Sequence, residues 1–483
     1  MLERTVKTAP ALPAEKTSPR GVYDRYHIDT QPAPDLTQWP SRFTVKVQRS
    51  GLAKLLIKEL FHYRGRKDVI LSRPCLYGVF SGPVGGFAPR EHLCVGCLRC
   101  TTEFPEFVQV EHNPARQRLG DDYFTFGYVD ALTYEAQTGA IPVKGAGYRG
   151  KFGGQGWDGM WTDMSEIVRP TRDGIHGREH ISTVVDIGYK PNALSFDEQG
   201  KLLGTAPSTF SLPLSLMFDA PPPNSAEDTV STISSQTAVE ISTLSILPLG
   251  QIIKLGLTGD HIVPLVKPDE VENLRLLGFA LRLIEMDGWD QTLYDEIRAQ
   301  FPESQIALRL PFTEDDAVLG YVDAGIHIFH FLADYHGKNE DDAFVLDLIR
   351  ATHKTFVDAG IRQEVTLLGS GGMIAAEHVP KAIICGLDAV ALDTPLLVAL
   401  QAEFQGQCAD RQTSHFEMPK RLNVEWGVRR LKNMSATWRD QLLEILGAMG
   451  LREVRRLRGE VGRAMFMHDI EKEAFIDVEG YRG

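Results

Sequence analysis

Three cysteines with a regular spacing are the residues in this sequence best placed to do chemistry. Cys94, Cys97 and Cys100 form a C-x₂-C-x₂-C pattern. Thiolates this close together suit a metal centre better than a disulfide framework in a chain of this length. The spacing lets three thiolates wrap an iron–sulfur cubane, because the intervening backbone amides also point at its sulfurs. A zinc site, which usually takes paired C-x₂₋₄-C knuckles, and redox-inert thiols are the alternatives.

The same segment resembles one half of a bacterial ferredoxin motif, C-x₂-C-x₂-C-x₃-C-P. Phe104 stands at the fourth cysteine position and Pro105 follows it. A [4Fe–4S] cluster needs a fourth ligand, and Cys75 is the best candidate because it shares the loop-rich stretch 72–105. If Cys75 is too distant, a three-iron cluster or a non-cysteine ligand becomes the expectation. The remaining cysteines, Cys385 and Cys408, lie much further along the chain.

Composition restricts the class of protein. The chain has 483 residues, 43% of them hydrophobic and 24% charged, which is ordinary for a globular protein with a large core. Its net charge of −13 argues against a dedicated nucleic-acid binder. No apolar run approaches the ~18–20 residues that cross a bilayer, and the first residues lack the apolar core of a secretory signal. We therefore expect a cytoplasmic protein without a membrane span.

The elements that must position these cysteines fall into four predicted regions. Residues 1–60 read as an extended arm and a helix, 61–139 as the cysteine-bearing segment, 140–405 as a barrel, and 406–483 as a helical tail. The arm is too sparse in apolar residues to fold alone, so we expect it to contact a partner or its own body, with the partner slightly favoured. In the helix, 51–63, one face is apolar, and we expect that face to pack into a core.

Eight short apolar runs follow residue 210, and helix-like stretches separate most of them. The runs are 212–218, 244–247, 261–266, 281–286, 305–311, 326–332, 365–369 and 389–392. This alternation predicts an α/β fold, specifically a (β/α)₈ TIM barrel. Ligands bind such barrels where strands end. That places Arg309, Asp334, Ser370–Gly372 and Asp393–Thr394 on one face. A glycine pair after a strand can bring backbone N–H groups to a phosphate, although a simple tight turn explains it equally well.

The stretch VTLLGSGGMIAAEHVPKAIICGLDAVALDTPLLVAL, residues 365–400, resembles the FMN-binding synthase domain of glutamate synthases. Residues 160–183 and 211–223 resemble segments of the short, archaeal-type members of that family. The resemblance implies a barrel carrying FMN at the carboxyl ends of its strands. It assigns Ser370, Gly371 and Gly372 to one phosphate loop and Asp393 and Thr394 to a second. Arg309 takes the place of a strand lysine that contacts the flavin ring.

Some positions depart from the family pattern. Asp393 replaces a glycine, which would place a carboxylate beside a phosphate. Residues 332–340, LADYHGKNE, replace a Gly- and Asp-rich stretch, and the family's own three-cysteine loop after the last barrel helix is absent. His176 and His180 stand four residues apart without a third ligand, so we interpret them as structural or solvated.

Two functions remain open from the sequence. The first is an iron–sulfur, FMN-dependent oxidoreductase that passes electrons from a [4Fe–4S] cluster on Cys75, Cys94, Cys97 and Cys100 to a barrel-bound flavin and a small substrate. By the resemblance, the substrate is 2-oxoglutarate, converted to glutamate. The alternative is a non-catalytic electron-transfer or scaffold subunit with a degenerate flavin site. Either function implies other redox subunits as partners, contacted partly through the arm, with an oligomer allowed.

Overall fold

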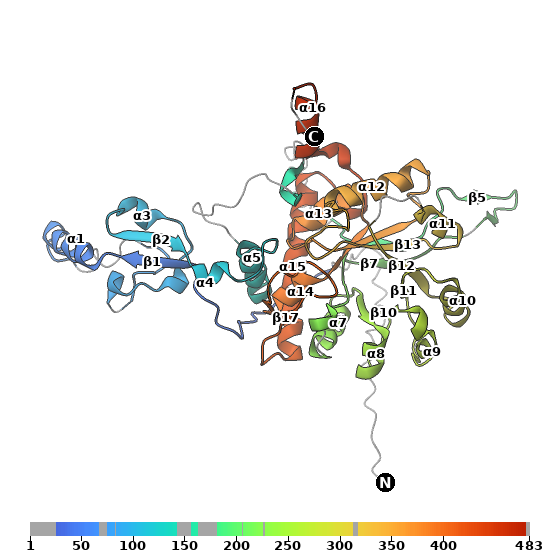
Figure 1. Cartoon of the computed structure of the whole chain (residues 1–483), viewed down its shortest axis with the longest axis horizontal. Coiled ribbons are helices and arrows are strands. Elements are labelled where there is room, and N and C mark those ends of the chain that lie inside the picture. The colour runs from blue at the N-terminus through green and yellow to red at the C-terminus, as the bar shows by residue number, and fades with distance from the viewer. Residues whose placement is uncertain are drawn as a thin grey trace, which may run out of the picture.

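The protein consists of a small N-terminal module attached to a large barrel, seen in a computed structural model (Figure 1). The structure describes residues 26–66, 75–82, 84–142, 156–162, 181–204, 206–225, 228–312 and 317–479. His176 and His180 lie outside these residues. No helix in the described part of the chain is both long enough and apolar enough to cross a membrane.

Eight parallel strands close into a barrel, as the sequence predicts. Each of the eight apolar runs overlaps one of these strands. Their bounds are β8 (Leu216–Phe218), β9 (Ser245–Pro248), β10 (Ile262–Val266), β11 (Leu283–Asp287), β12 (Gln305–Pro311), β13 (Ile328–Leu332), β14 (Thr366–Ser370) and β15 (Ala389–Leu392). The strand order follows the chain, and β15 closes the barrel on β8. Strands that are buried on both faces read as continuous apolar runs, which is why the sequence reveals them.

Helices surround the barrel and complete its βα units. They are α7 (Asp228–Glu240), α8 (Leu249–Leu255), α9 (Val271–Leu274), α10 (Gln291–Gln300), α11 (Val318–Asp323), α12 (Val345–Asp358), α13 (His378–Cys385) and α14 (Thr394–Ala399). The barrel interior is packed with apolar side chains that include Met217, Ile246 and Leu368. A hairpin of β4 (Val185–Tyr189) and β7 (Ser208–Leu212) joins that cluster, and Gly188 is hydrogen-bonded to Thr366, the first residue of β14. The hairpin therefore covers the amino end of the barrel and leaves its carboxyl end for a ligand.

The C-terminal tail is only partly helical. The long helix α15 (Val424–Ala448) begins at Asn423, whose side chain accepts a hydrogen bond from the Trp426 N–H. Shorter elements flank it: β16 (Glu403–Phe404), β17 (Phe416–Glu417), β18 (Ala464–Phe466), which pairs with β3 (Met160–Thr162), and α16 (Met467–Phe475). Arg455 and Arg456 lie in a 3-10 turn, η8 (Val454–Arg456), where Arg455 binds Asp186. Arg458, which follows the turn, binds Asp388.

The described part of the N-terminal arm packs on the chain's own body. Arg430 on α15 is fully buried and donates to the carbonyl of Ala33 and to Asp35. The side chain of Asn433 bonds both the N–H and the carbonyl of Gln31. Residues 26–40 thus lie against α15 and its neighbour α5 (Phe126–Thr138), and the expected contact of the arm with a partner stays a prediction.

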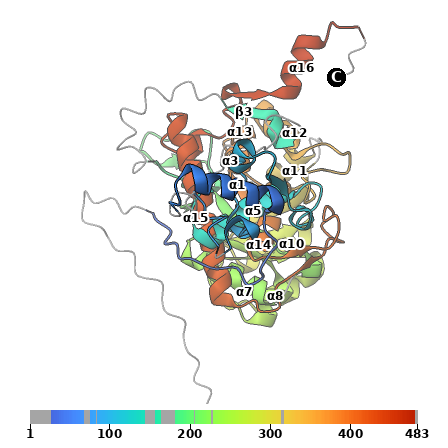
Figure 2. The same ribbon diagram turned by 90° about the vertical axis from the view of Figure 1, so that its left-hand side faces the viewer.

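The cysteine-bearing segment folds together with the end of the arm. Strand β1 (Phe43–Val47) pairs antiparallel with β2 (Val108–His112), so a boundary at residue 60 would separate two paired strands. The same module contains α1 (Arg49–His62), η1 (Gly85–Phe87), η2 (Glu91–Leu93) and α3 (Arg99–Glu103). Figure 2, turned to view the module from its outer end, shows α1 and α3 in front of the barrel.

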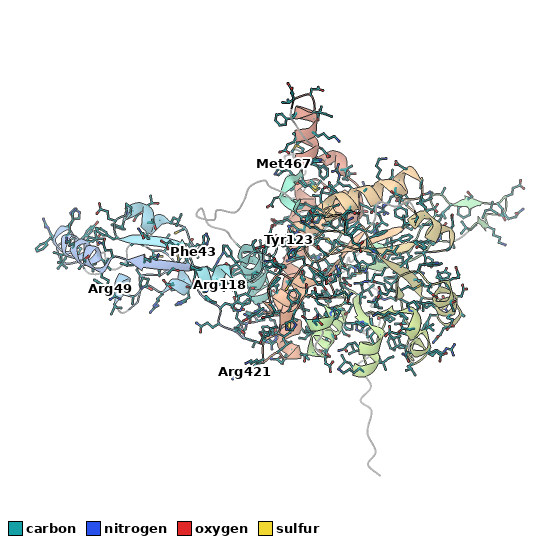
Figure 3. All side chains as sticks on the ribbon, viewed as in Figure 1. Phe43, Arg49, Arg118, Tyr123, Arg421 and Met467 are labelled. Carbon is teal, nitrogen blue, oxygen red and sulfur yellow. The ribbon has the colours of Figure 1, made fainter. Side chains whose placement is uncertain are left out.

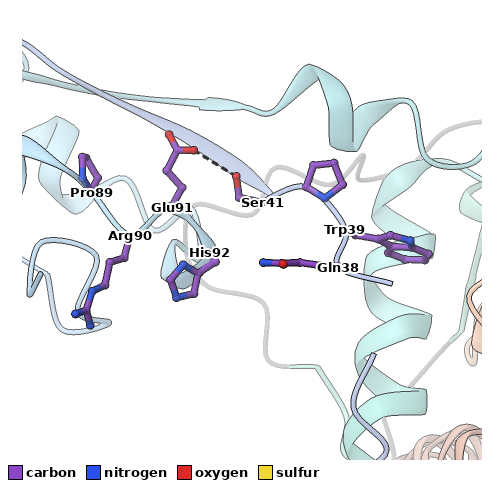
Figure 4. A pocket seen from close by; sticks show the side chains of 8 residues that line it. Gln38, Trp39, Ser41, Pro89, Arg90, Glu91 and His92 are labelled. Carbon is purple, nitrogen blue, oxygen red and sulfur yellow. Dashed lines mark hydrogen bonds between the residues drawn. The ribbon is translucent and has the colours of Figure 1, made fainter. Parts of the chain in front are cut away.

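Ion pairs connect the module to the barrel side of the molecule. Asp130 on α5 is buried and binds both Arg42 and Arg116, the latter on the short helix α4 (Pro114–Gln117). Beside this junction lies an open cavity of about 660 Å³, lined by residues 38–41 and 89–92. Figure 4 looks into this cavity and shows Ser41 bonded to Glu91 across it. The junction is therefore built from polar contacts.

Candidate functional site

The predicted site residues of the barrel gather at the carboxyl ends of its strands. Arg309 lies near the end of β12 and Ser370 ends β14, with Gly371 and Gly372 directly after it. Asp393 and Thr394 follow β15 and begin α14. The barrel thus brings together residues that are up to 85 positions apart in the chain, counted from Arg309 to Thr394.

A buried network of charges joins these residues across the barrel. The Arg309 Nη1 atom lies 2.8 Å from Asp219 Oδ1 and 2.7 Å from Glu285 Oε1. His330 bridges Glu285 and Ser370, with its ring nitrogens 2.9 Å and 2.7 Å from their oxygens. Burial alone would raise the pKa of Asp219, but the Arg309 guanidinium holds it well below its usual range. The charge of Arg309 is therefore balanced by carboxylates that the sequence did not single out.

The first glycine loop forms a concave set of backbone donors. Gly371 and Gly372 have φ angles of +96° and +70°, a conformation that favours glycine. Gly371, Gly372 and Met373 are buried, and their N–H groups donate to no acceptor among the described residues. The carbonyl of Gly372, by contrast, accepts bonds from Tyr123 and Trp157. Unpaired N–H groups on consecutive residues form a nest suited to an anion, since leaving them buried and unbonded is costly.

Close packing behind this loop explains why both glycines are needed. A Cβ on Gly371 would lie 2.5 Å from the Asp334 carbonyl oxygen, and one on Gly372 would lie 2.4 Å from the Gly337 Cα. Both contacts come from the loop between β13 and α12, which contains most of the rewritten stretch 332–340. His336 fixes that loop to Asp121 at 2.8 Å. The loop between β13 and α12 therefore packs against Gly371 and Gly372 and holds the anion nest in place.

The second loop is arranged differently, because its donor already has a partner. The Asp393 carboxylate accepts the Thr394 N–H at 2.6 Å and the Arg411 Nη2 at 2.8 Å. Arg411 also donates to the Ala333 carbonyl at 2.6 Å, contacts Asp219 at 3.3 Å, and lies over the Tyr335 ring. Burial raises the pKa of Asp393 despite the nearby Arg411.

Arg411 is a further residue of this site that sequence reasoning missed, along with Asp219, Glu285 and His330. It lies in a polar stretch, CADRQTS, between β16 and β17, where nothing in the pattern marks it. Its binding to Asp393 answers the objection that a carboxylate stands at a phosphate loop, because the guanidinium supplies the opposite charge. The residues present therefore fit the phosphate group of FMN, with the nest at Gly371–Met373 as donors and Arg411 as the nearby cation.

The four predicted cluster cysteines lie together in the N-terminal module. Cys94 and Cys100 each interact electrostatically with both Cys75 and Cys97. Cys75, Cys94 and Cys100 pack on the small core formed by Val45, Val79 and Val108. Cys385 and Cys408 are buried elsewhere, on α13 and between β16 and β17.

Within the described residues, no group of three or more His, Cys, Asp or Glu side chains is close enough to hold a metal ion. A zinc ion would need its sulfurs about 4 Å apart, since each Zn–S bond is about 2.3 Å. A cubane cluster binds each thiolate through a different iron, so its ligands stand further apart. A cluster on these cysteines therefore stays a prediction.

The cysteine loop turns through left-handed backbone. Gly96 has a φ of +68° and Leu98 a φ of +60°. A Cβ on Gly96 would lie 2.3 Å from the Phe43 ring, whose position in the module is labelled in Figure 3. The backbone N–H groups of Gly96 and Thr101 bond the sulfurs of Cys94 and Cys100, which favours the thiolates, whereas burial raises the pKa of both thiols. Metal binding would therefore displace protons from these sulfurs.

Comparison with known proteins adds evidence on the family. Residues 345–452 match a family described as "Conserved region in glutamate synthase". The "Archaeal-type glutamate synthase [NADPH]" of Dehalococcoides mccartyi is 22% identical over 435 residues, which cover 77% of this chain and 86% of that protein. The "Archaeal glutamate synthase [NADPH]" of Methanocaldococcus jannaschii is 29% identical over 251 residues, 49% of this chain and 46% of that protein.

Solved structures with a similar fold include a mandelate oxidase and a flavocytochrome b2. The first is 14% identical with a TM-score of 0.34, covering 62% of this chain and 97% of that one. The second is 13% identical with a TM-score of 0.37, covering 67% and 86%. The match to residues 345–452, which run from α12 into the turn after α15, and the two archaeal-type relatives agree with the resemblance of residues 365–400. This chain is therefore similar to glutamate synthases, most clearly across residues 345–452.

Proposed function

We propose that this protein is an FMN-dependent, iron–sulfur oxidoreductase of the glutamate synthase type. FMN would bind at the carboxyl end of the barrel, and a [4Fe–4S] cluster would bind to Cys75, Cys94, Cys97 and Cys100. The substrate we propose is 2-oxoglutarate, which reductive amination converts to glutamate, in keeping with the names of the archaeal relatives.

The observation that carries the proposal is the nest at Gly371–Met373. Three buried backbone N–H groups without an acceptor in the described structure lie at the carboxyl end of a barrel strand, where barrels of this architecture bind ligands. Arg411 supplies a cation nearby, since its Nε atom donates to the Ala333 carbonyl oxygen, from which a Cβ on Gly371 would be only 2.6 Å away. A phosphate group would meet the unpaired donors and the cation together.

The chain's own residues prepare this end of the barrel in three ways. Bound FMN would supply the chemistry of passing electrons between a one-electron carrier and a small substrate. Arg309 forms ion pairs with Asp219 and Glu285 and so partly neutralises these two buried carboxylates at the carboxyl end of the barrel. His330 contacts Glu285 on one side and Ser370 on the other, so it connects the buried carboxylate to the strand that bears the phosphate nest. The Glu285 Oε2 atom is buried without a partner in the described structure and is thus the free acceptor of the network.

Flavin release from anaerobically purified protein tests the proposal. We expect about one FMN per chain and broad iron–sulfur absorbance. Gly371→Ala should lose the flavin, since the new Cβ would lie 2.5 Å from a backbone oxygen. Gly250→Ala is the matched control, because an added Cβ there meets nothing within 4 Å. Iron–sulfur absorbance without extractable flavin in the unaltered protein would contradict the proposal.

A second candidate is a non-catalytic electron-transfer subunit whose flavin site has degenerated. It is favoured by the second loop, where Asp393 binds the Thr394 N–H that a phosphate would otherwise use. If it is correct, Asp393→Gly, which frees that N–H, should raise the flavin content above that of the unaltered chain, and the cluster of the unaltered chain will be reduced and reoxidised without turnover of 2-oxoglutarate. Recovery of FMN with the unaltered chain excludes this candidate.

A further inference from the structure

Helix α1 exposes an apolar face that nothing in the described chain covers. Its sequence predicts packing into a core, but Gly51 is the one fully buried residue in the helix. Ile57, Leu60 and Phe61 are 57%, 46% and 80% exposed. They stand at i, i+3 and i+4, so they form one stripe on the helix surface. Of the face expected to pack into a core, Leu52, Leu55, Leu56 and Tyr63 are partly buried and only Leu60 is exposed, so the stripe lies mainly beside that face.

The helix is attached to its module by its first turns. Gly51 lies against the Phe107 ring, where a Cβ would be only 2.2 Å from the nearest ring carbon. Leu52 contacts the backbone of Gly86 on η1. The remaining turns project beyond these contacts, and Figure 1 shows α1 at the end of the molecule furthest from the barrel. Burial of the apolar stripe thus requires something other than the described parts of this chain.

The cysteine segment exposes apolar side chains as well. Leu76, directly after Cys75, is 88% exposed, and Tyr77 is 49% exposed. Val84, directly before η1, and Phe87, the last residue of η1, are 56% and 37% exposed. The Leu52 side chain of α1 lies against Gly86 of η1, so the two elements belong to one module. Exposed apolar side chains on neighbouring elements are typical of an interaction surface.

The same helix is basic in an acidic protein. Residues 49–66 contain five basic residues and one acidic residue, whereas the whole chain has a net charge of −13. Lys54 and Lys58 are exposed and flank Ile57 and Phe61 at helical spacing. Neither lysine, nor Arg64 or Arg66, forms an ion pair with another described residue. An acidic partner with an apolar contact patch would complement this surface in both charge and polarity.

We propose that α1 and the exposed side chains of the cysteine segment form the docking surface for a small acidic electron-carrier protein. The proposal rests on the proposed cluster, because electron transfer between proteins requires a carrier to dock beside the redox centre. The transfer moves one electron from the reduced carrier to the chain's cluster, with no bond formed or broken and no proton displaced. The surface is of the small, charge-steered kind used for transient redox encounters.

Binding of an acidic [2Fe–2S] ferredoxin, labelled with a fluorophore, tests the proposal on the full chain. Lys54→Glu with Lys58→Glu should lower the association rate about tenfold at about 0.02 M salt, and the difference should vanish at about 0.5 M salt, where exposed charges are screened. Phe61→Ser should raise the dissociation rate about tenfold and leave the association rate nearly unchanged. The control is Lys420→Glu with Arg421→Glu, which makes the same charge change on the barrel side (Figure 3).

Each outcome decides the proposal. Equal association rates for the chain with Lys54 and Lys58 reversed and for the unaltered chain, with unchanged circular dichroism, overturn it. Self-association in sedimentation that Phe61→Ser abolishes overturns it as well, by assigning the face to a second copy of this chain. Cys97→Ser separates docking from the cluster, since ferredoxin binding that survives loss of iron supports the docking surface. If the unaltered chain has no iron–sulfur absorbance, the cluster fails, and the salt-dependent binding still decides whether the docking surface exists.

Discussion

Replacing Arg411 by Gln most directly tests whether this guanidinium neutralises the buried Asp393 carboxylate at the carboxyl end of the barrel. Asp393 is 3% exposed, and Arg411 is the one cation that binds it among the described residues. Loss of the guanidinium leaves a buried carboxylate that is neutralised by taking up a proton. We therefore expect Arg411→Gln to destabilise the barrel in a way that depends on pH.

The size of the effect follows from proton linkage. An unfolded carboxyl has a pKa of about 3.9, and each pKa unit corresponds to about 1.36 kcal/mol. Keeping Asp393 protonated in the folded variant therefore costs at most about 4 kcal/mol at pH 7 and about 1.5 kcal/mol at pH 5. The sign follows from the raised folded-state pKa: the penalty is absent below the unfolded pKa and grows as the pH rises. Burial already raises the pKa of Asp393 in the unaltered protein, so the measured difference is smaller than these limits.

Urea unfolding at pH 5 and pH 7, followed by tryptophan fluorescence, measures this difference. The double variant Arg411→Gln, Asp393→Asn should recover most of the lost stability at pH 7, because residue 393 then carries no buried carboxylate. Arg421→Gln serves as the control, since Arg421 is exposed and forms no ion pair with a described residue. Equal destabilisation at both pH values, or no recovery in the double variant, would refute the reasoning.

Two further predictions concern the cysteine segment. Gly96→Ala should abolish iron binding, because the residue has a φ of +68° and its Cβ would lie 2.3 Å from the Phe43 ring. The control is Gly200→Ala, at a similar φ of +79° but in open space, which should retain iron. Metal analysis measures the iron content of both variants. Cys75→Ser should lose at least one iron per chain and change the low-temperature electron paramagnetic resonance spectrum, whereas Cys408→Ser should alter neither; an unchanged spectrum in Cys75→Ser would mean that Cys75 is not the fourth ligand.

The barrel could be predicted from the sequence because its strands are buried on both faces. Parallel strands of this kind are continuous apolar runs, so each of the eight can be recognised from its own residues. Gly371 and Gly372 after β14 can also be recognised from the sequence. Only glycine readily combines a positive φ with such a close approach to the backbone of a neighbouring loop. The spacing of Cys94, Cys97 and Cys100 is likewise a property of residues close together in the chain. In each of these cases the physical constraint acts on neighbouring residues.

The tertiary structure decided what depends on residues far apart in the chain. Arg411 reaches Asp219, Ala333 and Asp393 from a polar loop, and no local pattern distinguishes it from a solvated arginine. Helix α1 has the apolar periodicity of a core helix, yet its predicted face is only partly buried, and Ile57, Leu60 and Phe61 are exposed in the described chain. Periodicity predicts a helix, whereas burial and charge pairing depend on three-dimensional neighbours. The sequence alone therefore determined the barrel, its glycine loop and the cysteine spacing, while only the fold determined the charge partners of the site and the exposed face of α1.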